Sequence, residues 1–249
     1  MKFDFKFMNY IIEIATSDFN TTKSAVEGGA DRIELCANLA EGGTTPSYAH
    51  IKKCRETFEV LIYPIIRPRG GDFLYNKDEF AMMENDIRLC KELGCDGVVI
   101  GLLNMDGSID ITRTAELVEL AYPMGVTFHR AFDRCKDPFV ALEELVEIGC
   151  ERILTSGQVP SVNEGVELIT ELNKKAAERI IIMPGSGVRK ENIKMLAEKT
   201  GCVEFHSSLR SKINSPMQFV HPGFKNAEES YLNNAINAGD VRALRNNLL

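Results

Sequence analysis

Three short segments of the sequence alternate apolar side chains with acids, a thiol or imidazoles. They are residues 32–36, 126–129 and 203–206. Alternation with a period of two is typical of a β-strand with one apolar and one polar face. A strand buried on both faces of an α/β fold is instead apolar throughout. The pattern therefore predicts a polar site where these strands end, with internal salt bridges as the alternative.

The acidic and imidazole side chains near these segments suit proton transfer. Glu13, Glu34, His129 and Asp133 are the candidate catalytic residues, and His129 is followed directly by Arg130. A histidine near an arginine and an aspartate can be a general base, a metal ligand or an oriented hydrogen-bond donor. The sequence leaves these three roles open.

Two arginines and a glycine-rich turn suit an anion. Arg67 and Arg69 lie in the segment RPRGGDF, and a guanidinium group matches the geometry of carboxylate and phosphate. A surface loop with solvated charges is the alternative. Gly185, Ser186 and Gly187 precede a predicted helix, where free backbone N–H groups bind anions. We expect these five residues to form an anion-binding site.

Possible metal ligands divide by their softness. Cu(I) prefers thiolate, thioether or imidazole, and the strand ends offer Cys36, His129 and His206, with Cys135 as a further thiol. A hard cation prefers carboxylate oxygens. The carboxylates available to it are Glu13, Glu34, Asp133 and Glu204. Both kinds of metal site remain open on residue chemistry alone.

Eight short strands alternate with segments of helical length. They are expected at residues 11–15, 31–36, 60–66, 97–101, 126–130, 152–156, 179–183 and 203–207. This alternation implies a parallel sheet, and eight units in 249 residues favour a (β/α)8 TIM barrel over an open sheet. Because barrel sites lie at the C-terminal ends of the strands, several polar side chains should converge there on one cavity. These are Glu13, Glu34, Cys36, His129, Glu204 and His206.

The regular alternation ends after the eighth strand. Residues 211–225 are rich in Pro, Asn and Ser and predict a long loop, and residues 228–248 predict one or two helices that close the ring. The chain is therefore expected to be one domain, with a core at 11–211 and a C-terminal loop and closing helix at 212–249. Residues 1–9 could form an edge strand, a disordered lead or a packing arm.

Composition limits the partners and the compartment. The net charge of −7 argues against a nucleic-acid partner. No apolar run approaches the roughly 20 residues that span a membrane, and Asp4 and Glu13 interrupt the short N-terminal hydrophobic stretch, which argues against a signal peptide. The seven cysteines form no CxxC pair and no zinc-type spacing. An odd count suits a reducing compartment, so we expect a cytoplasmic protein.

Six motifs, taken in order, resemble those of the CutC family of copper-homeostasis proteins. They are GADRIELC from residue 29, GGTTPS from 42, RPRGGDF from 67, HRAFD from 129, LTSG from 154 and EFHSS from 204. The resemblance covers about residues 11–211, with a weaker similarity in the C-terminal helix. Two positions depart from the family pattern, because Thr44 replaces a usually apolar residue and Ser186 replaces a glycine or alanine.

The resemblance carries several expectations. It implies a cytosolic TIM barrel, a homodimer or higher oligomer, and a role in copper homeostasis in which Cys36 belongs to a Cu(I) site. The matching residues at the barrel mouth are Arg67, Arg69, His129, Asp133 and His206.

Two functions follow from the sequence. The first is copper homeostasis with Cu(I) bound through Cys36 and an imidazole or a second thiol. The second is an enzyme of unspecified reaction on a small anionic substrate, a carboxylate or a phosphate. Residue chemistry favours the second, because many hard, charged groups surround one soft ligand. A structural scaffold is a third alternative, which the polar interior disfavours.

Overall fold

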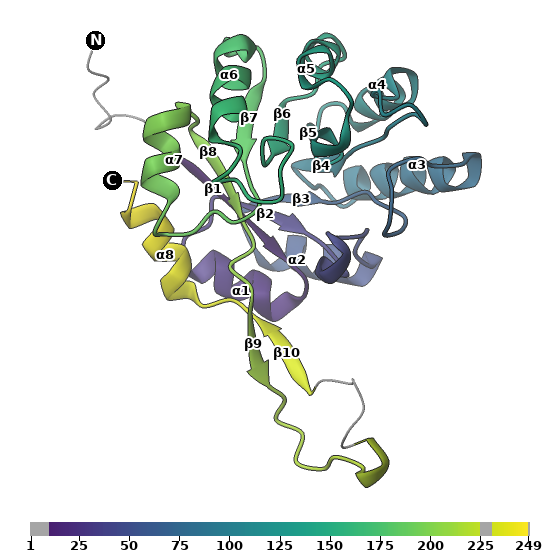
Figure 1. Ribbon diagram of the computed structural model, residues 1–249. Helices are drawn as coiled ribbons and strands as arrows, with labels where there is room; N and C mark the ends of the chain where they lie inside the picture. Colours follow the sequence, from purple (N-terminus) through teal and green to yellow (C-terminus); the bar gives the residue numbers. More distant parts are fainter. Residues whose placement is uncertain (1–9, 225–230, 249) are drawn as a thin grey trace.

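The computed structural model describes residues 10–224 and 231–248, so the alternatives for residues 1–9 lie outside the described residues. Strands occupy the centre of the molecule and helices surround them (Figure 1). The central strands are β1 (Ile11–Thr16), β2 (Arg32–Leu35), β3 (Leu61–Pro64), β4 (Gly97–Ile100), β5 (Gly125–Phe128), β6 (Arg152–Thr155), β7 (Ile181–Pro184) and β8 (Glu204–Ser207). The helices that follow them are α1 (Phe19–Glu27), α2 (Tyr48–Thr57), α3 (Lys77–Glu92), α4 (Ile111–Ala121), α5 (Pro138–Glu147), α6 (Val166–Ala176) and α7 (Ile193–Thr200).

The strands form a ring of two parallel sheets, in the orders β3-β2-β1-β8 and β4-β5-β6-β7. The sheets meet where Ile65 pairs with Val99 and where β7 lies beside β8. The first and last strands pair directly, with Glu13 opposite His206. This arrangement confirms the predicted (β/α)8 barrel. Each predicted strand is present, and its ends are shifted by at most two residues.

Helix caps fix the ends of the loops at the barrel mouth. Ser47 accepts a hydrogen bond from the first turn of α2, as its position in the sequence suggests. Asn76 and Glu79 form a reciprocal capping box at the start of α3, and Asp137 caps α5 with Pro138 at its first position. Each cap stabilises its helix by about 1 kcal/mol. The loops after β2, β3 and β5 are thereby anchored at their far ends.

Two separate apolar clusters stabilise the barrel. The larger lies between the strands and the outer helices and contains side chains such as Ile14, Ile33 and Phe205. The smaller lies inside the ring and consists of Cys36, Tyr63, Ile65 and Val99, with Leu39 packed against it. Most TIM barrels fill this interior with branched apolar side chains. Here a small apolar cluster leaves much of the interior to polar groups.

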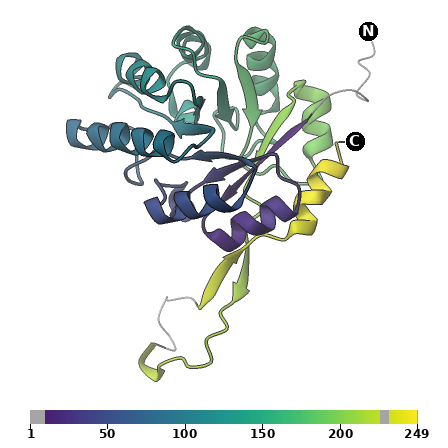
Figure 2. The same ribbon diagram turned by 180° about the vertical axis from the view of Figure 1, so that it is seen from behind.

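A hairpin follows the eighth strand, where the sequence predicted a loop and then helices. The short strands β9 (Ser211–Asn214) and β10 (Leu232–Ala235) pair antiparallel and project away from the barrel (Figures 1 and 2). The expectation of a loop at 211–214 and of a helix at 232–235 was therefore wrong. Each strand is only four residues long, and its partner lies far along the chain, so local pattern carries little signal for the pairing.

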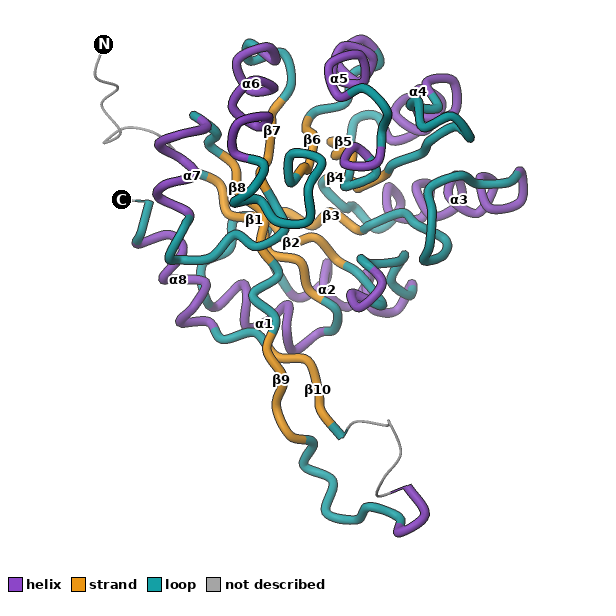
Figure 3. Tube along the Cα trace, in the orientation of Figure 1, coloured by secondary structure: helices purple, strands orange, loops and turns teal. Residues whose placement is uncertain are grey.

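The last helix completes the outer layer. A 3-10 turn at η4 (Pro222–Phe224) lies in the projecting arm, and α8 (Ala238–Asn246) follows the hairpin and lies beside α1 (Figure 3). Gly28 at the end of α1 permits this contact, because a Cβ there would lie 2.5 Å from Cβ of Val241. No helix in residues 10–224 or 231–248 has the length and apolarity needed to cross a bilayer.

Candidate functional site

A cavity of about 380 Å³ opens at the C-terminal ends of the strands. Its size is that of a site for a small organic molecule. Residues at the ends of the barrel strands and in the loops that follow them line it. They are Ala15, Glu34, Leu39, Glu41, Gly42, Ile65, Arg67, Gly71, Phe73, His129, Arg130, Arg134, Leu154, Ser186, Gly187, Arg189, His206, Ser208 and Arg210.

A carboxyl group and an imidazole lie together in this lining. Oε2 of Glu34 is 3.8 Å from Nε2 of His206, and Nδ1 of His206 is 2.7 Å from Oε1 of Glu13. The Cys36 thiol donates to Oε2 of Glu34 at 3.4 Å. The glycine after β7 leaves room for the Leu154 side chain in the same wall, because a Cβ on Gly185 would lie 2.5 Å from Cδ1 of Leu154. Glu13 therefore orients His206, which presents its second nitrogen towards Glu34.

The pKa values of both Glu34 and His206 are raised, so both groups hold a proton more readily than usual. Burial raises the pKa of Glu34, although the nearby His206 opposes the effect. Burial alone would lower the pKa of His206, but its hydrogen bond to the Glu13 carboxylate and the charge of Glu34 outweigh burial and raise that pKa. For Glu13 burial is outweighed by Arg32 and His206, which lower its pKa to about 2. Glu13 is thus a fixed anion beneath a pair that can exchange a proton.

An ion network fills the barrel below the pair. Arg32 donates to Glu13 and to Glu204, both at 2.5 Å, and Arg152 donates to Glu204 at 3.1 Å. All four side chains are buried. The internal salt bridges that the sequence offered as an alternative are therefore present, in the layer under the cavity.

The six polar residues expected to converge occupy three positions. Glu34, His129 and His206 line the cavity. Glu13 and Cys36 lie directly behind that lining, in contact with His206 and Glu34. Glu204 faces the interior one layer lower, where two arginines hold it, and it does not line the cavity.

Arg67 is a buried cation with no carboxylate beside it. Its side chain is 3% exposed and donates at 2.8 Å to the carbonyl groups of Glu41, Gly43 and Gly71. Among the described residues no carboxylate lies within 4.0 Å of it, and its Nε has no hydrogen-bond partner. Burying a charge without a counter-charge is costly. The site therefore favours an anionic ligand at Arg67.

His129 presents a neutral imidazole to the same cavity. Its Nδ1 accepts a hydrogen bond from the Ala131 backbone N–H at 3.1 Å, so in the neutral ring Nε2 carries the proton. Burial, followed by the positive charge of Arg67, lowers the pKa of His129 to about 3. Its Nε2 is buried and has no partner among the described residues. His129 is thus an oriented donor, one of the three roles that the sequence left open.

Asp133 holds neighbouring residues in place. It does not line the cavity, and it accepts hydrogen bonds from Thr155, Ser156 and Gln158. Its carboxylate also forms an ion pair with Nε of Arg130 at 2.7 Å. Asp133 therefore holds the loop after β6 and places Arg130 against the cavity.

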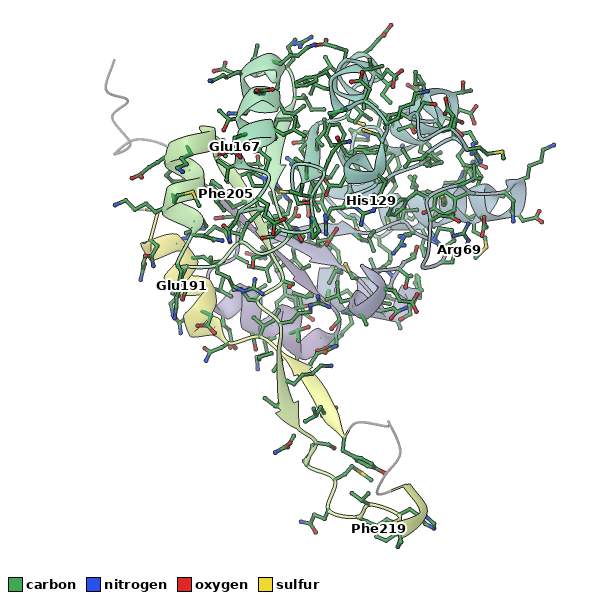
Figure 4. The ribbon with its side chains drawn as sticks, in the orientation of Figure 1. Arg69, His129, Glu167, Glu191, Phe205 and Phe219 are labelled. Carbon is green, nitrogen blue, oxygen red and sulfur yellow. The ribbon has the colours of Figure 1, made fainter. Side chains whose placement is uncertain are left out.

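The predicted anion-binding residues are divided by the structure. Ser186 and Gly187 line the cavity with Arg67, whereas Gly185 and Arg69 do not. Arg69 instead pairs with Glu79 at 2.6 Å and with Asp72 at 2.9 Å, and it lies near α3 at the outer edge of the barrel while His129 lies nearer the centre (Figure 4). The capping role of Glu79 explains this position, because it fixes a carboxylate within reach of Arg69.

Four further arginines line the cavity and were not among the predicted site residues. They are Arg130, Arg134, Arg189 and Arg210. Arg130 donates to the hydroxyl groups of Ser186 and Ser156, and Arg189 donates to that of Ser207 at 3.1 Å. Arg130 stands in the HRAFD motif, and its place beside His129 was the one available signal.

The soft donors do not fit a Cu(I) site. Burial raises the pKa of the Cys36 thiol well above its ordinary value, and the charge of Glu34 raises it further, so the thiolate is disfavoured. Both ring nitrogens of His206 face carboxylates, and Cys135 contacts Gln158. No cluster of three or more His, Cys, Asp or Glu suited to a metal ion occurs among the residues that the structure describes.

Replacing Cys36 by serine is therefore expected to change Cu(I) affinity by less than about threefold, because the thiol is protonated and isolated from other soft donors. An anaerobic Cu(I) titration against a competing chelator measures this. Cys150→Ser is the matched control, since Cys150 is also buried but lies before β6, at the opposite end of that strand from the cavity. An affinity loss of about tenfold or more in Cys36→Ser alone would show that the thiol is a ligand.

Known proteins show clear similarity to this chain. The CutC family model matches residues 10–211. A CutC family protein of Chromobacterium violaceum is 46% identical over 96% of this chain and 98% of its own length, and one of Parabacteroides distasonis is 53% identical over 85% of this chain and 88% of its own. The solved structure of a CutC protein of Streptococcus agalactiae, whose proposed role is copper homeostasis, superimposes with a TM-score of 0.77 at 33% identity, covering 80% of this chain and 99% of that one.

Proposed function

This chain belongs to the CutC family, and we propose that it is an enzyme that transfers a proton to or from a small organic anion. Its barrel mouth contains a buried acid–imidazole pair together with a group of arginines. The observation that carries the proposal is the Glu34–His206 pair in the wall of the cavity. A carboxyl group and an imidazole with raised pKa values are suited to general acid–base chemistry near neutral pH.

The charge of the cavity supports an anionic substrate. Five arginines line it against the two carboxyl groups of Glu34 and Glu41, although the whole chain carries a net charge of −7. An acidic protein that gathers positive charge in one cleft raises the local concentration of anions there. The substrate is accordingly a small molecule with a carboxylate or phosphate group.

The loops after β7 and β8 supply a site for a phosphate group. Among the described residues the backbone N–H groups of Ser186 and Gly187 have no hydrogen-bond partner. Ser186 has a φ of +69°, a left-handed conformation that costs energy in a residue with a side chain and is often kept for function. Arg189 and Arg210, which follow β7 and β8, also line the cavity. Phosphate sites of TIM barrels commonly use these two loops.

The contacts of His206 with Glu13 and Glu34 suggest the path that the proton takes. Glu13 accepts from Nδ1 of His206, so Nε2 is the nitrogen that faces Glu34 and the cavity. A proton taken from the substrate by Glu34 can pass to His206, where the fixed anion Glu13 stabilises the imidazolium. The ion network beneath holds Glu13 in place.

The link to copper homeostasis is carried by the Streptococcus agalactiae relative. For this chain we infer that any such role works through the small-molecule chemistry of the cavity and not through a Cu(I) ion held at Cys36. The resemblance also supports a cytosolic homodimer, which size-exclusion chromatography with light scattering would test.

Inorganic phosphate is expected to bind the wild-type protein, and Arg189→Met is expected to weaken it by about tenfold, the effect of losing one charge-assisted hydrogen bond. Isothermal titration calorimetry measures both affinities. Arg179→Met is the matched control, because Arg179 forms an exposed ion pair with Glu143 and does not line the cavity. Wild-type protein that binds no phosphate, or an Arg189 variant that binds as tightly as the control, would contradict the proposal.

A further inference from the structure

Two buried N–H groups of residues that line the cavity have no acceptor within hydrogen-bond distance among the described residues. Five buried side-chain polar atoms lack a partner in the described part of the chain, and Nε of Arg67 and Nε2 of His129 are the two whose residues line the cavity. Leaving a buried donor unsatisfied is energetically costly. Two such donors in one site point to an acceptor that the ligand brings.

Phe73 lies close to both residues that carry these donors. The guanidinium of Arg67 lies 4.9 Å from the centre of the Phe73 ring, and the His129 ring lies 5.0 Å from it. Arg67 follows β3 and His129 follows β5, with β4 between these strands in the ring, and both residues line the cavity. The positive charge of Arg67 is also one of the causes that keep His129 neutral.

The His129 ring is held in one orientation. The Ala131 backbone N–H donates to Nδ1, which fixes Nε2 as the donor. Gly101, at the end of β4, leaves the space that the ring occupies, because a Cβ there would lie 2.3 Å from Cε1 and Nδ1 of His129. A donor fixed before the ligand arrives needs no reorganisation during the reaction.

From these contacts, and resting on the proton-transfer function proposed above, we infer that Arg67 and His129 bind the carbonyl oxygen of the substrate and stabilise it as an enolate. The substrate class is then a small anionic carbonyl compound with a hydrogen on the carbon next to the carbonyl. The Glu34–His206 pair lies in the same cavity and is the group that takes that hydrogen as a proton.

The step balances without any further reactant. The pair removes the proton, the electrons of the C–H bond form a C=C bond, and the carbonyl π electrons move to the oxygen. That oxygen accepts hydrogen bonds from Nε of Arg67 and Nε2 of His129. Return of the proton to the same carbon gives exchange with solvent hydrogen or epimerisation. A neutral imidazole is an effective donor to such an oxygen.

The test compares two probes, inorganic phosphate and phosphoglycolohydroxamate, which adds a planar enolate-like oxygen to a phosphate. In wild-type protein the hydroxamate should bind about 100-fold more tightly than phosphate, as expected for an analogue of a transition state. His129→Leu and Arg67→Met should each reduce that ratio by about tenfold or more, since each removes one donor to the enolate-like oxygen. His129→Gln, which restores an N–H donor, should recover most of the ratio.

A second readout uses unaltered protein. In protein labelled with ¹⁵N-histidine, the Nε2 proton of His129 should shift downfield when the hydroxamate is added and should not move with phosphate. An unchanged ratio in both variants, or an unmoved Nε2 proton with the hydroxamate bound, would overturn the assignment of the two donors while leaving the proposed function in place. Failure of wild-type protein to bind either probe would overturn both.

Discussion

Replacing Arg32 by methionine is expected to lower the free energy of unfolding by about 3–5 kcal/mol, the effect of removing one partner from a buried ion pair. Arg32 donates to both Glu13 and Glu204 and is 2% exposed. Methionine would fill similar space but would leave Glu13 without its principal cation. Urea unfolding followed by circular dichroism measures the loss.

Two further variants isolate the charge effect. Arg179→Met removes an exposed arginine paired with Glu143, and exposed pairs contribute at most about 1 kcal/mol. Adding Glu13→Gln to Arg32→Met removes the stranded anion and should recover a substantial part of the stability. A loss in Arg32→Met no greater than in Arg179→Met would show that the network is not a stabilising element of the barrel.

Replacing Glu34 by glutamine is expected to slow proton transfer by about 10²–10⁴-fold, the usual contribution of a positioned general acid or base. The amide keeps the size of the side chain but cannot exchange a proton at neutral pH. Incorporation of solvent deuterium into glycolaldehyde phosphate, an enolisable phosphorylated aldehyde, measures the rate by proton NMR. Phosphate affinity should stay within about threefold of wild type, because Glu34→Gln removes no group that contacts the phosphate.

Glu41→Gln provides the matched control for this measurement. Glu41 is the other carboxylate that lines the cavity, and it lies at the exposed turn η2 (Leu39–Glu41). Its replacement should leave deuterium incorporation nearly unchanged. Equal rates in wild type and Glu34→Gln would remove Glu34 from the chemistry, and a wild-type protein that binds the aldehyde without exchange would contradict proton transfer to this probe.

Strand alternation predicted the interior of the barrel well. In each strand the side chain alternates between the helices and the barrel axis, so Glu13, Glu34 and His206 could be placed on one face from sequence alone. The structure puts all three in one connected cluster. Alternation carried no information on height along the axis, which is why Glu204 was expected in the cavity and instead lies one layer below.

Loop residues were harder to predict, because their positions depend on partners that are distant in sequence. Arg69 was expected to face an anion, but Glu79 of α3 holds it outside the cavity. Arg189 and Arg210 reach the cavity from the loops after β7 and β8, and neither belongs to a strand whose alternation fixes a direction. The sequence showed that arginines were present and could not show which way each one turns.

The pairing of β1 with β8 has a consequence for how the chain matures during synthesis. Glu13 and Arg32 leave the ribosome close together, and their strands are neighbours in the finished ring. Glu204 and His206, which complete the charge balance of that same interior, emerge some 190 residues after Glu13. Until then the nascent half-ring holds polar groups that water must continue to solvate. The interior can therefore become dry only when β8 arrives, so the site cannot form until some 190 residues after Glu13 have been synthesised.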